Sequence, residues 1–130
     1  MLKKSLLLGI VSGLLAGLAS FIYQKVYTGS LEADFTKVFT PVGVFVSSVV
    51  GCLLASFGYW LLDKWMKGKA DLAFNLIFAI LSFITILGPF AAKLPVTIES
   101  PELFPGLTVP MHFFPILGWL TLKPAFIKNN

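Results

Sequence analysis

Long apolar runs constrain the folding of this chain more than any other feature. Three of them cover residues 5–24, 41–62 and 71–92, and a proline-rich apolar segment follows at residues 109–127. A helix needs about 20 apolar residues to cross the ~30 Å hydrocarbon core of a bilayer. Since only helices and closed barrels satisfy their backbone polar groups in lipid, we expect an all-α polytopic membrane protein. The expected fold is a single-domain bundle of four transmembrane helices with a proline-interrupted fourth segment.

The composition agrees with lipid as the solvent. Only 12% of the 130 residues are charged, whereas a soluble domain has about 25%. The net charge of +4 comes from ten lysines and six acids, with no arginine. Lysines that flank membrane helices explain this charge better than nucleic-acid binding does. We therefore expect the lipid bilayer as a partner, and no nucleic acid.

The lysines also predict a topology. Three of them follow the second apolar run, at Lys64, Lys67 and Lys69. If this loop is cytoplasmic, both chain ends share its side, and seven lysines lie inside against three outside, as the positive-inside rule requires. The seven are Lys3, Lys4, Lys64, Lys67, Lys69, Lys123 and Lys128. We expect a multi-pass protein of a bacterial inner membrane. The first 20 residues resemble a secretory signal, but a run this long favours a retained first helix.

Small residues recur every four positions in the first two runs. Gly9, Gly13 and Gly17 do so in the first run, with Ser12, Ala16 and Ser20 as a second row beside them. Gly43, Ser47 and Gly51 do so in the second run. Residues four apart share a helix face, and small side chains let another backbone approach closely. The pattern predicts that helices one and two pack against each other through these rows. A homodimer seam through the same residues is an alternative.

The connecting segments contain helix-start signals. Thr40 before Pro41 is typical of a helix start, and Asp71 is suited to cap the third helix. Ser100-Pro101 predicts a one-turn helix. Residues 31–38 have an apolar face opposite a charged one, which predicts a short helix lying flat at the membrane surface.

The third run has the most polar face, formed by Asn75, Ser82 and Thr85. Such a face serves either interhelical hydrogen bonding or the lining of a substrate path. Pro89 cannot donate to the carbonyl of Thr85, so we expect a kink there.

The fourth segment is short. Residues 109–122 form only ~21 Å of helix, so either the helix continues to Ile127 with Lys123 reaching the membrane surface, or residues 103–108 enter the bilayer as irregular backbone. Pro110 and Pro115 remove the helical donors for the carbonyls of Gly106 and Met111.

His112 is the only histidine and is expected within one turn of the outer helix start, near Glu99 and Glu102 in sequence. It is a candidate to titrate, to bind a metal with the glutamates, or to supply a haem ligand across a dimer. The alternative is a hydrogen bond to a carbonyl freed by a proline. The candidate ligand-binding residues are His112, Glu99, Glu102, Asn75, Ser82 and Thr85. One histidine and one cysteine, Cys52, fall short of a zinc site, and we expect no cofactor and no metal.

No catalytic motif is present, and no acid lies in the middle of a run, which argues against proton-coupled transport. The first hypothesis is a structural or accessory membrane protein that associates with itself or with a membrane-protein partner. The alternative is a small transporter, channel or ligand-binding protein with a cavity near His112 and the Asn75/Ser82/Thr85 face. A third is an enzyme that uses His112 with Glu99 or Glu102.

Overall fold

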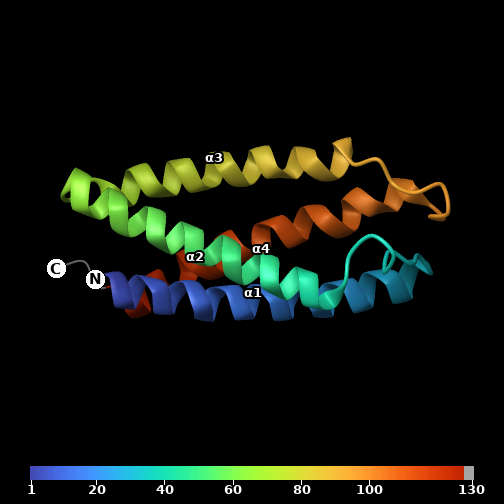
Figure 1. The fold of residues 1–130 in the computed structure, drawn as a ribbon, viewed down its shortest axis with the longest axis horizontal. Coiled ribbons are helices and arrows are strands. Elements are labelled where there is room, and N and C mark those ends of the chain that lie inside the picture. The colour runs from blue at the N-terminus through green and yellow to red at the C-terminus, as the bar shows by residue number, and fades with distance from the viewer. Residues whose placement is uncertain (128–130) are drawn as a thin grey trace.

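The computed structural model describes residues 1–127, which form a bundle of four long helices (Figure 1). The helices are α1 (Leu2–Leu31), α2 (Pro41–Met66), α3 (Ala70–Ala91) and α4 (Phe104–Phe126), and a 3-10 turn, η1 (Pro101–Leu103), leads into α4. Each helix is long and apolar enough to cross a membrane. The expected all-α membrane bundle is confirmed. Lys128, which entered the lysine count, lies outside the described residues.

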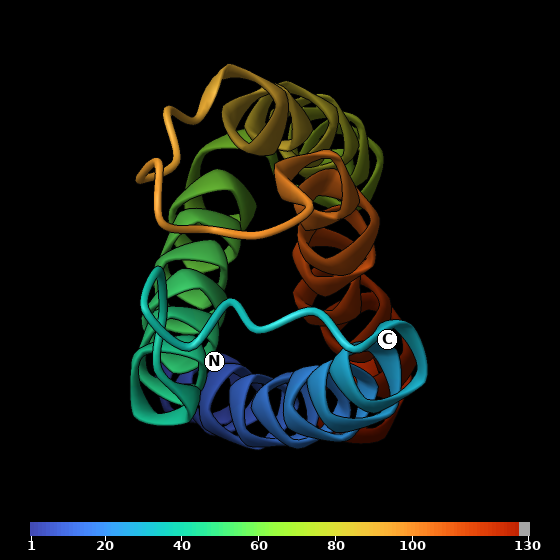
Figure 2. The ribbon, with the colours of Figure 1, turned by 90° about the vertical axis from the view of Figure 1, so that its right-hand side faces the viewer.

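The bundle has two distinct ends. Met1, Ile127 and the turn at residues 67–69 lie at one end, here called the terminal end. The α1–α2 loop (residues 32–40) and the α3–α4 loop (residues 92–100) lie at the other, the loop end (Figures 1 and 2). Helix α1 packs closely on both α2 and α4. Helices α2 and α3 meet at the terminal end and diverge toward the loop end, with α4 behind the gap (Figure 1).

The glycines of α1 face α2. A Cβ added at Gly9 would lie 2.6 Å from the Ser56 Oγ, and one at Gly13 would lie 2.6 Å from the Cα of Val49. A Cβ at Gly17 would lie 2.5 Å from the ring of Phe45. These distances are shorter than van der Waals contact, so only glycine allows α2 to approach this closely.

The small-residue row of α2 does not form its side of this contact, contrary to the sequence prediction. A Cβ at Gly51 meets nothing within 4 Å, and one at Gly43 meets only the Thr40 Oγ1. Ser47 is exposed. The buried face of α2 is the neighbouring row, Ser48, Cys52, Ser56 and Tyr59. The two rows are one residue apart, which is about 100° of helix rotation, and both are rich in small residues.

The segment 31–38 is not the predicted surface helix. Helix α1 continues to Leu31, and the residues after it form a turn at 36–38. Phe35 is fully buried, and its ring centre lies 5.5 Å from that of Phe104. Phe35 of the apolar face that suggested a membrane surface thus packs against α4, whereas Leu31 stays exposed.

Helix α4 begins five residues earlier than expected and continues through Pro110 and Pro115 as one helix. Its 23 residues span about 35 Å, which is enough to cross a bilayer. Residues 104–108 are therefore helical rather than irregular. The Tyr23 hydroxyl donates to the Gly106 carbonyl at 2.9 Å, which replaces the donor that Pro110 lacks.

Thr40 caps α2 as expected, since its Oγ1 accepts from the Gly43 N–H at 3.1 Å.

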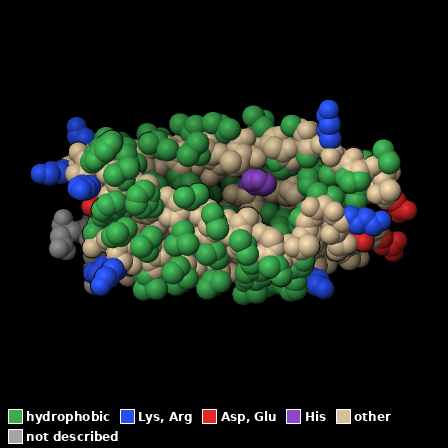
Figure 3. Space-filling model, viewed as in Figure 1, with side chains coloured by type: hydrophobic (Ala, Val, Ile, Leu, Met, Phe, Trp, Pro, Cys, Tyr) green, Lys and Arg blue, Asp and Glu red, His purple; other side chains and the backbone are tan. Residues whose placement is uncertain are grey.

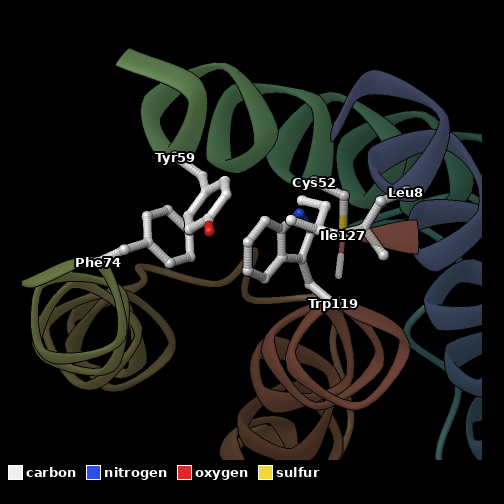
Figure 4. Close-up of a cluster of buried hydrophobic side chains, with 6 residues drawn as sticks. All are labelled: Leu8, Cys52, Tyr59, Phe74, Trp119 and Ile127. Atoms are coloured by element: carbon white, nitrogen blue, oxygen red, sulfur yellow. The ribbon is translucent and has the colours of Figure 1, made fainter. Parts of the chain in front are cut away.

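A buried cluster closes the terminal end of the bundle. In Figure 4 the Trp119 indole lies between Phe74 and Tyr59 on one side and Cys52 and Leu8 on the other. The Trp119 Nε1 donates to the Ser56 Oγ at 2.8 Å. Since every helix contributes a side chain, this cluster holds all four together at this end.

Asp71 does not cap α3. The N-cap is Lys69, without a side-chain cap, and the Asp71 Oδ1 accepts from the Tyr59 hydroxyl at 2.6 Å. The same oxygen accepts from the Lys123 Nζ at 2.5 Å. Lys123 is only 8% exposed, so its ammonium group is held against α3. The ion pair with Asp71 compensates the charge that α4 buries.

A second cluster closes the loop end. It combines Ala33 and Phe35 of the α1–α2 loop, Ile98 of the α3–α4 loop, and Phe104 and Leu107 of α4. Figure 2 shows both loops running across this end of the bundle.

Candidate functional site

A cleft of about 390 Å³ lies among the four helices. Its volume is in the ~300–1,000 Å³ range of small-molecule sites. Each helix contributes to its lining, and the α1–α2 loop adds Phe39. The lining residues are Ser20, Phe39, Val44, Ser47, Ser48, Gly51, Thr85, Thr108, Met111, His112 and Pro115. Figure 3 shows the imidazole of His112 in a hollow on the face where α2 and α3 diverge.

His112 lies deeper than the sequence suggested. Because α4 begins at Phe104, His112 is eight residues inside the helix, or about 12 Å from its start. It is therefore at membrane depth rather than at the surface. A histidine at this depth is a functional candidate.

The ring of His112 has one nitrogen engaged. Its Nδ1 lies 2.7 Å from the carbonyl oxygen of Thr108, one turn earlier in α4. A carbonyl oxygen only accepts, so Nδ1 must carry the proton. In the neutral ring, Nε2 is then left with a lone pair that accepts a hydrogen bond. The expected bond to a carbonyl is present, but the acceptor is Thr108 rather than one freed by Pro110 or Pro115.

Ser20 presents a fully buried cleft hydroxyl that has no hydrogen-bond partner in residues 1–127. It is 0% exposed, and its Oγ makes no hydrogen bond within the described residues. Three other lining hydroxyls donate to carbonyls of their own helices: Ser47 to Val44, Thr85 to Ser82 and Thr108 to Phe104. Since buried polar groups are nearly always paired, an unpaired hydroxyl on a cleft wall requires an explanation.

Of the predicted polar face of α3, only Thr85 lines the cleft. Ser82 is buried, and its carbonyl accepts from the Thr85 hydroxyl at 2.8 Å. Asn75 is exposed and does not contribute to the lining.

Glu99 and Glu102 are not near His112. Both lie at the loop end and line separate surface depressions, Glu99 with Glu32, Asp34 and Lys37. Hydrogen bonds from the side chain and backbone of Thr36 hold the pKa of Asp34 below its usual value. Within residues 1–127 no group of three histidine, cysteine or acidic side chains is placed to hold a metal. The structure therefore does not bring His112 and the two glutamates together.

Sequence reasoning did not identify Ser20, Ser47 and Gly51 as cleft residues, because it treated all three as helix-packing residues. In α1 the spacing of Ser20 from Ser12 suggested a shared packing face. Their hydrogen bonds distinguish the two serines: the Ser12 hydroxyl donates to the Leu8 carbonyl at 2.6 Å, whereas the Ser20 hydroxyl has no partner in the described residues.

Comparison of the chain with protein-family models, with curated proteins and with solved structures finds no match.

Proposed function

We propose that this chain is a small multi-pass membrane protein that binds a small molecule in the cleft around His112. The observation that carries the proposal is the cleft itself, with an imidazole nitrogen free to accept and a buried Ser20 hydroxyl without a partner. Ligand sites typically combine an apolar lining with a few polar groups of this kind.

The competing hypothesis of association through small residues loses part of its support. Gly9, Gly13 and Gly17 contact α2 of the same chain, so this row needs no second copy to explain it. The small-residue row of α2 that does not contact α1 is explained in part by the cleft, because Ser47 and Gly51 of this row line the cleft.

We further propose that both termini are cytoplasmic. Of the described lysines, Lys25, Lys37 and Lys93 belong to the loop-end half of the chain, together with Glu32, Asp34, Glu99 and Glu102. The other six belong to the terminal-end half, as the positive-inside rule favours. Figure 3 shows acidic side chains gathered at the loop end.

Cysteine labelling tests this topology in intact cells. The native Cys52 is buried and gives a low background. A membrane-impermeant maleimide should label Val96→Cys, at a fully exposed loop position, and should not label Lys67→Cys. Labelling of Lys67→Cys alone, or of both, contradicts the proposed topology.

Native mass spectrometry in a mild detergent tests ligand binding. We expect the wild-type protein to retain a one-to-one adduct from the membrane. Gly51→Leu should lose the adduct, because the added side chain enters the cleft without meeting atoms within 4 Å of its Cβ.

Gly58→Leu is the matched control, because Gly58 lies on the same helix in equally open surroundings but does not line the cleft. It should retain the adduct. Absence of an adduct from the wild type, or equal retention by Gly51→Leu, contradicts the proposed function.

A further inference from the structure

We infer that the ligand is a neutral lipid with a free hydroxyl in its head group, and that it enters sideways from the bilayer between α2 and α3. This inference rests on the proposed function and specifies its ligand. Four features of the cleft lead to it: its opening, its lack of charged side chains, its hydrogen-bond acceptors and the state of Ser20.

The opening of the cleft favours lateral entry. The cluster around Trp119 closes the terminal end, and the cluster around Phe35 and Phe104 closes the loop end. Both loops cross the loop end (Figure 2). The hollow that contains His112 is instead visible from the side of the bundle, between α2 and α3 (Figure 3). In a membrane this side faces lipid, so the ligand comes from the bilayer.

The lining excludes a charged head group. None of the described lining residues is Asp, Glu, Lys or Arg. With the His112 ring neutral, a charge brought to this depth would meet no side chain of opposite charge, and a buried unpaired charge costs several kcal/mol. Phe39, Val44 and Met111 instead offer apolar surface for an acyl chain. The favoured ligand is therefore uncharged and amphiphilic.

The polar groups of the cleft are mainly acceptors. When the His112 ring is neutral, its Nε2 accepts a hydrogen bond, because Nδ1 donates to the Thr108 carbonyl. Two further lining residues, Thr85 and Met111, precede Pro89 and Pro115 by four positions. Their carbonyls thus lack the usual helical donor. A head group must donate a hydrogen bond to satisfy such acceptors, and the hydroxyl is the simplest uncharged donor that lipids carry.

Ser20 completes the recognition. Its hydroxyl can both donate and accept, and no group of the part of the chain that the structure describes is bonded to it. In a lipid with an ester or second hydroxyl group, an oxygen of that group accepts a hydrogen bond from the Ser20 hydroxyl, while the head-group hydroxyl donates to the His112 Nε2. A diacylglycerol has both groups, and it is the probe we choose.

Photolabelling in lipid nanodiscs tests the inference. Three probes share one diazirine-bearing acyl chain and differ only in the head group: a diacylglycerol, its O-methyl ether and the corresponding phosphatidic acid. We expect the diacylglycerol to label cleft-lining residues of α2 and α4 about fivefold more than the ether, as one lost hydrogen bond predicts. The phosphatidic acid should label them less still.

Two serine variants sharpen the result. Ser20→Ala should reduce labelling by the diacylglycerol about fivefold, whereas Ser12→Ala, on the same helix but outside the cleft, should not change it. Equal labelling by the ether or the phosphatidic acid, or equal labelling of Ser20→Ala, overturns the hydroxyl inference but leaves ligand binding intact. Absence of cleft labelling by all three probes contradicts both the inference and the proposed function.

Discussion

The hydroxyl of Tyr23 donates a 2.9 Å hydrogen bond to the carbonyl of Gly106, the group that Pro110 leaves without a helical donor. The bond links α1 to α4 across 83 positions of sequence. Tyr23→Phe should therefore lower the free energy of unfolding by about 1 kcal/mol. In a Pro110→Ala background the backbone N–H of residue 110 replaces the lost donor, and the loss should fall below about 0.5 kcal/mol. Unfolding by denaturant in detergent measures both values, and equal losses would show that the bond does not compensate for the proline.

Gly13 sets the distance between α1 and α2, because a Cβ there would lie 2.6 Å from the Cα of Val49. Gly13→Ala must push backbone away from backbone and should cost about 2 kcal/mol. Gly51→Ala is the control, since its Cβ meets nothing within 4 Å, and it should change stability by less than about 1 kcal/mol. Thermal unfolding of the two variants compares them directly. A Gly13→Ala protein as stable as the wild type would rule out the close contact.

Asp71 and Lys123 hold α3 and α4 together with the help of the Tyr59 hydroxyl. Asp71→Asn leaves the Lys123 ammonium, whose side chain is 10% exposed, without its ion pair. The expected loss of unfolding free energy is about 3 kcal/mol, the low end for a buried pair, because the Asp71 side chain is 35% exposed.

The double variant Asp71→Asn/Lys123→Met removes both charges and should recover most of that stability. The interaction energy from the double-mutant cycle is the quantity to measure. A double variant less stable than Asp71→Asn would contradict this account of the pair.

The membrane bundle was predictable because length and hydropathy alone determine whether a helix can cross a bilayer. The start of α4 was not, since the fourth helix was expected to begin at residue 109 and residues 103–108 were considered as irregular backbone. Proline at the first positions of a helix lacks no required donor, so it permits the earlier start that the structure has. The end of α1 was also missed, because the apolar run ends near residue 24 whereas the helix continues to Leu31. Tertiary burial of Phe35 decided the conformation of the segment that follows.

The candidate site was predictable only in part. His112 and Thr85 were expected to share a cavity, and they do. Glu99 and Glu102 were grouped with His112 because they are near it in sequence. Since α4 begins earlier than expected, at Phe104, about two turns of helix separate them from the histidine. The partner of Asp71 lies 52 positions away on another helix, and no local pattern indicates such a pair. The Ser20 hydroxyl is buried without a hydrogen-bond partner in the described residues, and the pattern of a single helix does not encode which neighbouring groups reach it.

The central claim is that the Ser20 hydroxyl serves ligand binding in the cleft rather than folding. Ser20→Ala tests this claim most directly, because the substitution should weaken ligand binding without lowering the stability of the protein. Removing a buried hydroxyl without a partner should leave the unfolding free energy of the ligand-free protein unchanged or raise it by up to about 1 kcal/mol. The adduct seen by native mass spectrometry should at the same time fall about fivefold in occupancy. Ser12→Ala, which removes a satisfied hydroxyl, should retain the adduct. A Ser20→Ala protein that is less stable and yet binds its ligand as the wild type does would contradict the account.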